Sequence, residues 1–139
     1  MAERRIGIEV DGVKAVATLH DDVCPKAAEA FWQTLPISAT LTQSFWSGQA
    51  CEFAPGGAAL AKVTEMEEPV CSIYPGTIAV DAKEGTALIS YGPAEYRTDL
   101  GTQYLSRVAR IVEGRAELLK KIASLHDVGA KLIKVTRLA

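Results

Sequence analysis

Apolar and polar residues alternate strictly at the start of the chain. Every second residue is apolar between residues 5 and 10, and the same alternation returns between residues 13 and 19. A period of two is typical of strands that bury one face. Asp11-Gly12 lies between the two segments, and this dipeptide favours the two-residue turn of a β-hairpin. The pattern predicts an antiparallel hairpin formed by the first two strands.

A helical pattern follows between residues 25 and 35. Ala27, Phe31 and Leu35 recur every four residues, with further alanines beside them. That spacing predicts a helix whose small-residue face packs on a sheet. Pro25 suits the first turn of such a helix, and Pro36 ends it.

Strand patterns fill most of the remaining chain. The predicted strands are residues 37–45, 51–54, 69–74, 77–81, 86–91, 106–112 and 130–138. Residues 55–57 and 92–101 are predicted loops, and the acidic run 65–68 is interpreted as a solvated surface. A second helix is expected after Gly114, with Leu118, Leu119, Ile122 and Leu125 on one stripe and an exposed Glu117–Lys121 pair.

The order of these elements predicts a mainly-β single domain over residues 1–139. Many short antiparallel strands need protection at their edges, and closing the sheet into a barrel provides it. The two helices are far apart in the sequence, so each can cover one open end of the barrel.

Composition and charge narrow the classes of function. The chain has fifteen lysines and arginines and seventeen acidic residues, so its net charge is −2, and the two signs are mixed along the sequence. We therefore expect no nucleic-acid partner. No apolar run approaches the roughly 18 residues that a membrane helix needs. The N-terminus lacks the apolar region of a secretory signal, so we expect a cytoplasmic protein without a membrane partner.

The residues that most often hold metals or cofactors are sparse. Cys24, Cys51 and Cys71 match no zinc spacing, and their odd number argues against a disulfide framework. His20 and His126 have no acid or nucleophile at motif spacing and are interpreted as surface or capping residues. We expect no metal and no cofactor.

Several ordered motifs resemble known proteins. The segment D-D-V-C-P-K-A-A-E-A-F-W-Q-T-L, residues 21–35, resembles the opening of the first helix of cyclophilins. The segments S-F-W-S-G-Q, I-S-Y-G-P-A-E-Y-R and S-R-V-A-R-I-V-E-G resemble a small bacterial group of cyclophilin-like proteins of unknown function. This second resemblance covers nearly the whole chain. It implies a closed antiparallel cyclophilin-like β-barrel capped by two α-helices.

The chain also departs from the cyclophilin pattern. In the cyclophilins that this chain resembles, prolyl isomerases carry an arginine two residues after a phenylalanine on a strand. If that phenylalanine is Phe45, Ser47 stands at the arginine position. An arginine can stabilise the twisted prolyl amide through its charged hydrogen bonds, whereas a serine has no charge and a shorter reach. We expect no prolyl isomerase activity.

The candidate ligand-binding residues are Trp46, Ser47, Gln49, Glu52, Tyr91 and Arg97. Phe45 and Trp46 could floor a pocket or form a core pair at the barrel end. Glu52 could point into the barrel, where its charge would need a partner, or face solvent. Arg97 could bind an acidic ligand, or it could pair with Glu95 or Asp99 to hold its own loop. The same choice between site and core applies to Tyr91.

Three functions remain open at this point. The first is a domain that binds a small molecule at the barrel rim, for which an acid is one candidate. The second is a subunit or accessory of an amide- or lactam-metabolising enzyme, which only the resemblance suggests. The third is a structural subunit, for which a homodimer is the natural form.

Overall fold

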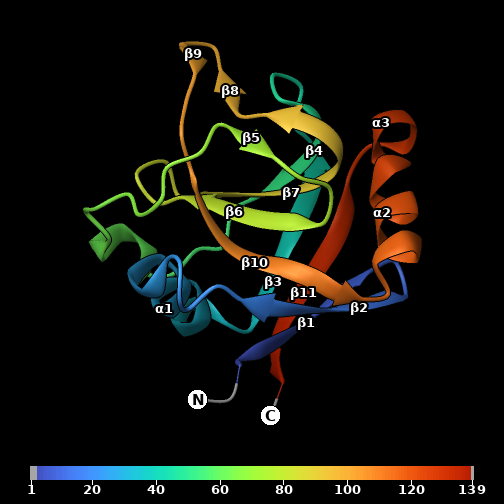
Figure 1. Ribbon diagram of the computed structural model, residues 1–139. Coiled ribbons are helices and arrows are strands. Elements are labelled where there is room, and N and C mark those ends of the chain that lie inside the picture. Colours follow the sequence, from blue (N-terminus) through green and yellow to red (C-terminus); the bar gives the residue numbers. More distant parts are fainter. Residues whose placement is uncertain (1–2, 139) are drawn as a thin grey trace.

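Eight antiparallel strands close into a barrel in the computed structural model, which describes residues 3–138 (Figure 1). Around the barrel the order is β4, β3, β11, β1, β2, β10, β6 and β7, and β7 pairs with β4 to close it. The bounds are β1 Arg5–Val10, β2 Val13–Leu19, β3 Ile37–Gln43, β4 Gly48–Phe53, β6 Thr77–Asp81, β7 Thr86–Glu95, β10 Ser106–Glu113 and β11 Lys131–Leu138. The predicted mainly-β barrel is confirmed.

The first hairpin forms where the sequence predicts it. β1 and β2 pair antiparallel from Arg5 opposite Thr18 to Val10 opposite Val13. Asp11 and Gly12 both have positive φ, +49° and +81°. Two positive φ values in a two-residue loop match the strand twist and require residues such as Asp and Gly.

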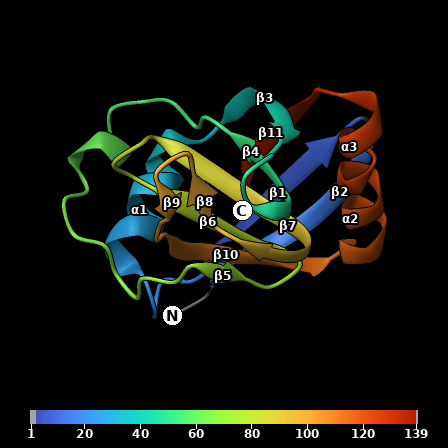
Figure 2. The ribbon, with the colours of Figure 1, turned by 90° about the horizontal axis from the view of Figure 1, so that it is seen from above.

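Helices cover the two ends of the barrel. Figures 1 and 2 show α1 (Pro25–Thr34) at one end and α2 (Arg115–Ala123), followed by the short α3 (Leu125–Val128), at the other. Phe31 of α1 and Ile122 of α2 are fully buried in the same core as the inward side chains of the strands. Closing both ends removes the apolar lumen from water, which is the main driving force for this arrangement.

A second, smaller core lies on the outside of the barrel wall. Ala50, Ala79 and Leu88 face outward from β4, β6 and β7, yet they are fully buried. Ile73, Tyr96 and Leu105 cover them, because the chain folds back over this wall on both sides of β7. Tyr96 donates a hydrogen bond of 2.9 Å to the buried carboxylate of Asp81. Burial and this carboxylate raise the pKa of the Tyr96 phenol.

Several predicted element bounds were wrong. β3 ends at Gln43 and residues 45–47 form a turn, and β4 begins at Gly48 instead of Cys51. Of the predicted strand 69–74, only β5 (Ser72–Ile73) and an isolated bridge at Val70 are present. The predicted loop 92–101 instead continues β7 to Glu95 and adds β8 (Arg97–Thr98), which pairs with β9 (Gly101–Thr102).

Gly92 and Pro93 explain why the loop prediction failed. A side chain at Gly92 would collide with Gln49, since a Cβ there would lie 1.7 Å from its Oε1. The glycine therefore allows two strands to approach closely. Pro93 sits where the β4–β7 register shifts between Gly48 and Ala50, and a bulge of this kind tolerates a missing N–H.

Two surface interpretations also need correction. Lys121 pairs with Asp11 in the first hairpin, at 3.4 Å, instead of the predicted Glu117. The acidic run 65–68 is not solvated throughout, because a Glu67 carboxylate oxygen accepts a hydrogen bond of 2.8 Å from the Ala27 N–H. This bond satisfies a free N–H group at the start of α1. A short 3-10 helix, η1 (Leu60–Lys62), precedes that run.

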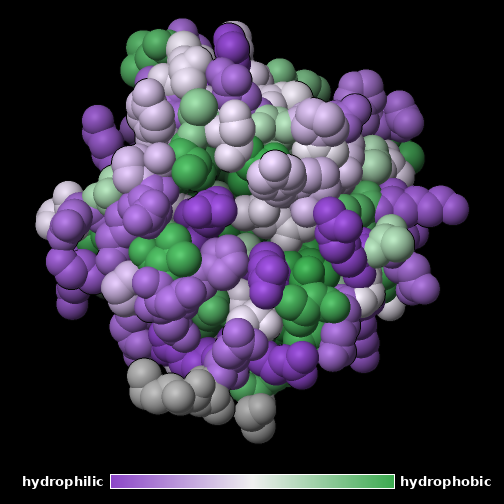
Figure 3. Space-filling view, viewed as in Figure 1, coloured by the Kyte–Doolittle hydropathy of each residue, from purple (hydrophilic) through white to green (hydrophobic). Residues whose placement is uncertain are grey.

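Hydrophilic side chains dominate the face drawn in Figure 3, and apolar side chains are scattered among them. None of the helices within residues 3–138 has the length and apolar character needed to cross a membrane.

Candidate functional site

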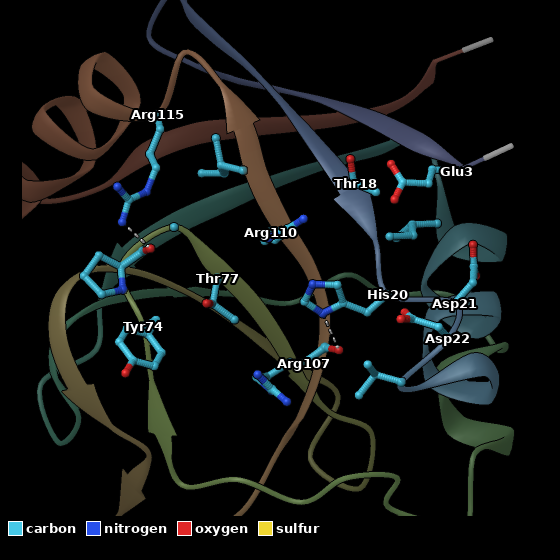
Figure 4. A pocket seen from close by; sticks show the side chains of 15 residues that line it. Glu3, Thr18, His20, Asp21, Asp22, Tyr74, Thr77, Arg107, Arg110 and Arg115 are labelled. Carbon is cyan, nitrogen blue, oxygen red and sulfur yellow. Dashed lines mark hydrogen bonds between the residues drawn. The ribbon is translucent and has the colours of Figure 1, made fainter.

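An open groove with a volume of about 820 Å³ lies on the outer face of β2, β10 and β6. We call it the arginine groove and define it by Thr18, His20, Thr77, Arg107, Arg110 and Arg115, which line it. Figure 4 shows these side chains converging from three strands and the start of α2. The arginine groove shares no residue with the ligand-binding residues predicted from the sequence.

A β-bulge places two of the arginines on the same face. Arg107 and Arg110 are three residues apart, so a regular strand would point them to opposite sides. The β10–β6 register shifts between Arg107 and Ala109. Arg107 consequently pairs with Ala79, and Arg110 pairs with Thr77, which lies two residues away on the same outer face. Val108 and Ala109 both join the inner core.

Arg115 enters the arginine groove from the first turn of α2. Its Nη2 donates a hydrogen bond of 2.8 Å to the Pro75 carbonyl. Gly76, with φ +86°, lets the guanidinium lie against the backbone, because a Cβ at this position would be 2.8 Å from Arg115 Nε. The turn before β6 therefore holds Arg115 beside the arginine groove.

Arg107 carries a polar atom that the protein does not satisfy. Its Nε is buried and has no hydrogen-bond partner among the described residues. Neither Arg107 nor Arg110 forms an ion pair within residues 3–138. A buried guanidinium N–H without a partner costs free energy, so it favours binding of an acceptor.

The carboxylates of the arginine groove lie toward its other end. In Figure 4, Glu3, Asp21 and Asp22 are separated from the three arginines by His20. Asp21 is already engaged, because Arg4 forms a salt bridge with it. His20 Nδ1 lies 3.2 Å from the Arg107 carbonyl, which fixes the imidazole beside β10. The arginine end therefore keeps its positive charge.

The aromatic turn (residues 44–47) carries the two rings that the sequence suggested as a pocket floor or a core pair. Phe45 is 84% exposed and Trp46 is 62% exposed. This exposure excludes the core pair. Phe45 lines the polar cavity described below, together with Gln49 and Tyr91.

Ser47 and Arg97 lie together, and their hydrogen bonds join the turn after β3 to the backbone of β8. The Ser47 hydroxyl accepts a hydrogen bond of 3.1 Å from the Arg97 N–H and donates one of 3.3 Å to the Arg97 carbonyl. The Arg97 guanidinium pairs with Glu95 at 3.1 Å. Arg97 thus forms the pair with Glu95 that the structural alternative predicts, and Ser47 is a buried residue of the turn between β3 and β4.

Gln49 and Tyr91 line a second, polar cavity of about 530 Å³ between the aromatic turn and α3. The Tyr91 hydroxyl donates a hydrogen bond of 2.7 Å to Gln43 Oε1, and Gln43 Nε2 donates one of 2.6 Å to the Gly48 carbonyl. Burial raises the pKa of Tyr91. Tyr91, Gln43 and the Gly48 carbonyl therefore satisfy one another, and Gln49, His126 and Asp127 supply further polar groups to the cavity.

Glu52 points outward from β4 and is half-buried. The alternative in which it faces the barrel interior is therefore wrong. Burial raises the pKa of its carboxyl group. Glu52 lines neither the arginine groove nor the cavity at Gln49 and Tyr91, so the predicted residues do not all line one cavity.

Sequence reasoning missed the arginine groove, although a signal was present. In S-R-V-A-R-I-V, the alternation breaks at Val108-Ala109, where two apolar residues are adjacent. Such a break indicates a bulge, and it moves the second arginine to the face of the first.

Comparisons with solved structures find the same architecture. McbB, whose structure was determined in complex with tryptophan, is 18% identical with a TM-score of 0.79. The match covers 95% of this chain but 44% of McbB, so the chain spans less than half the length of that protein. These values establish a shared fold.

Two shorter proteins match over nearly their full length. A hypothetical protein from Archaeoglobus fulgidus is 18% identical with a TM-score of 0.63, covering 98% of this chain and 95% of its own. A cyclophilin-type peptidyl-prolyl cis-trans isomerase from Cryptosporidium parvum is 11% identical with a TM-score of 0.60, covering 99% of both chains. The predicted cyclophilin-like fold is confirmed.

No curated protein sequence matches the chain. A family model described as "Protein of unknown function (DUF3830)" matches residues 6–137, which is nearly the whole chain. The chain therefore belongs to the DUF3830 family, whose function is unknown and whose fold here is cyclophilin-like.

Proposed function

We propose that this protein binds a small acidic molecule in the arginine groove. The observation that carries the proposal is the buried Nε of Arg107, which has no partner among the described residues and belongs to a side chain that lines a cavity of about 820 Å³. Arg110 and Arg115 add positive charge to the same wall. A carboxylate or phosphate bound there accepts the hydrogen bonds that the protein leaves unmade.

Neutral side chains complete a plausible anion site. Thr18 and Thr77 flank Arg110 on the two neighbouring strands, and their hydroxyl groups can donate to an anion. Pockets that bind small molecules combine a few such polar groups with a shaped wall. McbB, a protein of similar fold, was determined with tryptophan, a molecule that carries a carboxylate. That precedent supports a small-molecule ligand without placing it in this groove.

The absence of prolyl isomerase activity stays a prediction. Ser47, the residue that the cyclophilin resemblance aligns with the isomerase arginine, has its hydroxyl bonded to the Arg97 backbone. It cannot stabilise a prolyl amide while it holds that turn. The alternative role in amide or lactam metabolism rests on the resemblance alone, because no hydroxyl group of the arginine groove is hydrogen-bonded to His20 within residues 3–138.

Titrations of the intact protein with propionate and with inorganic phosphate test the proposal, followed by amide chemical shifts in NMR. We expect saturable shifts at the amides of Thr77, Arg107 and Arg110. Arg107→Gln and Arg110→Gln should each weaken binding by roughly tenfold, because each removes a charged donor.

Arg97→Gln is the matched control, since it removes the same charge from the site that the sequence predicted. It should leave both affinities within about twofold of the wild-type protein. If neither anion produces saturable shifts, or if Arg97→Gln weakens binding as much as Arg110→Gln, the proposal is wrong.

A further inference from the structure

A second groove adjoins the arginine groove and has the opposite character. We call it the apolar groove and define it by Ile73, Tyr74, Pro75, Pro93, Ala94 and Glu95, which line its volume of about 580 Å³. Tyr74 and Pro75 line the arginine groove as well. One short segment therefore forms a wall common to a cationic groove and an apolar one.

Arg115 is the arginine that contacts this common wall. Its guanidinium donates a hydrogen bond of 2.8 Å to the Pro75 carbonyl, which places the charge beside residues of both grooves. The rest of the guanidinium remains able to donate, because Arg115 forms no ion pair with a described residue. An anion held here lies next to the apolar groove.

The one acidic residue of the apolar groove does not oppose an anionic ligand. Glu95 is neutralised by Arg97 at 3.1 Å, and its carboxylate also accepts a hydrogen bond from Thr102. The Ser47 hydroxyl, which also faces this groove, is bonded to the Arg97 backbone. The surface left for a ligand is mostly the side chains of Tyr74, Ala94 and the two prolines, because Ile73 is almost fully buried at the base of the groove.

The common wall presents an exposed aromatic ring to a ligand. Tyr74 is 81% exposed, although its carbonyl is held by the buried Ser90 hydroxyl. Its backbone is thus fixed while its ring remains open to solvent between the two grooves. Exposed aromatic rings gain most from an offset-stacked or edge-on aromatic partner.

From this arrangement we infer that the ligand is a small aromatic carboxylate. Its carboxylate binds at the arginines of the arginine groove, and its ring lies across Tyr74 and Pro75 in the apolar groove. The inference rests on the proposed function and adds the chemical class of the ligand. A simple anion would use only the first of the two grooves.

Three acids with the same carboxylate and different hydrocarbon groups, together with one neutral amide, test the inference. The probes are propionate, 3-phenylpropionate, 3-cyclohexylpropionate and the neutral 3-phenylpropionamide, titrated into the intact protein and followed by NMR. We expect 3-phenylpropionate to bind roughly tenfold more tightly than propionate, because its ring leaves water for the apolar groove. The cyclohexyl acid should be intermediate, and the amide should bind at least tenfold more weakly than its acid.

Variants separate the two grooves. Tyr74→Ala should remove most of the preference for the phenyl acid and leave the affinity for propionate unchanged. Tyr104→Ala, which truncates another exposed tyrosine outside both grooves, is the matched control and should change neither value. In the wild-type protein, the amides of Ile73 and Ala94 should shift with 3-phenylpropionate and not with propionate.

The outcomes distinguish the inference from the proposed function. Equal affinities for propionate and 3-phenylpropionate, both lost in Arg110→Gln, would overturn the inference and leave the proposed function standing. Equal binding of the phenyl and cyclohexyl acids would overturn the aromatic class. Failure of every acid to bind would overturn both the inference and the proposed function.

Discussion

The arginine groove and the aromatic turn are both rich in polar or aromatic side chains at the barrel surface, but they use these groups differently. In the turn, Ser47 is bonded to Arg97 and Arg97 to Glu95. In the groove, a buried guanidinium atom of Arg107 is left without a partner in the described chain. A binding site is better recognised by polar groups that the protein leaves unsatisfied than by polar groups that are merely close together.

Charge reversal gives the largest expected difference between the two regions. Arg110→Glu places a carboxylate beside the bound anion, so we expect at least a roughly hundredfold loss of affinity for 3-phenylpropionate. Trp46→Ala in the aromatic turn should leave that affinity within about twofold. Isothermal titration calorimetry at low salt measures both values.

Lys134→Glu is the control for the change in net charge, because Lys134 is exposed on β11 and lines neither groove. A comparable loss of affinity in Lys134→Glu would show that binding depends on the overall charge and not on the arginine groove.

The rates at which the cysteine thiols react with a reagent compare how tightly the chain packs near the arginine groove and near the aromatic turn. Cys24 follows Val23, which lines the arginine groove, and Cys51 lies on β4, the strand that follows the aromatic turn; both are buried, whereas Cys71 is partly exposed. Burial raises the pKa of Cys24, and it raises the pKa of Cys51 to about 12. Since thiolates are the reactive form, an aromatic disulfide reagent at pH 8 should label Cys71 roughly a hundredfold faster than either other thiol.

Mass spectrometry of the labelled peptides identifies each site. Rapid labelling of Cys24 alongside Cys71 would mean that the wall at the start of α1 opens readily, and the groove could then not be treated as preformed.

Ser47→Ala tests whether the aromatic turn has a structural role. The variant leaves the Arg97 N–H without its acceptor, so we expect a loss of about 1–2 kcal/mol in the free energy of unfolding and a Tm lower by roughly 3–8 °C. Affinity for 3-phenylpropionate should stay within about threefold. Thermal unfolding and calorimetry on one preparation give both numbers, and an unchanged Tm would contradict the structural role.

The smallest expected effect is at Glu52. Burial raises the pKa of this carboxyl group in the folded state, so the folded protein binds its proton more tightly than the unfolded chain does. The contribution of Glu52 to the free energy of unfolding is therefore greatest at low pH, and it falls as the pH rises and the carboxyl group ionises. Glu52→Gln should raise the Tm at pH 7 by roughly 1–3 °C.

The gain from Glu52→Gln should disappear below the unfolded pKa of glutamate, where wild-type Glu52 is protonated in both states. Differential scanning calorimetry at pH 7 and at about pH 3.5 compares the two conditions. A gain of equal size at both pH values would rule out burial of the charge as the cause.

The barrel could be predicted because local patterns determine most of it. The alternation on both sides of Asp11-Gly12 specifies a hairpin, and the spacing of Ala27, Phe31 and Leu35 specifies α1. These signals involve residues close in the chain. Closure follows from the need to pair strand edges, and the pairing of β4 with β7 confirms it.

The candidate site could not be predicted in the same way, because it depends on contacts between distant residues. Arg115 meets Pro75 across forty residues, and Ser47 meets Arg97 across fifty. The motif that contains Arg107 and Arg110 was recognised only as part of a family resemblance. Its chemical meaning requires the face to which each side chain points, and the bulge in β10 alters that face.

The bulge in β10 also ties the candidate site to the integrity of the core. Because Arg107 and Arg110 are three residues apart, straightening the strand without removing a residue would turn one guanidinium toward the apolar lumen, where a charge without a partner is not tolerated. Two arginines at this spacing can therefore share the outer face only if the bulge is kept. Losing the bulge together with one residue between them would restore a spacing of two, which keeps both arginines outside, and aligned sequences would record that change as a difference in length.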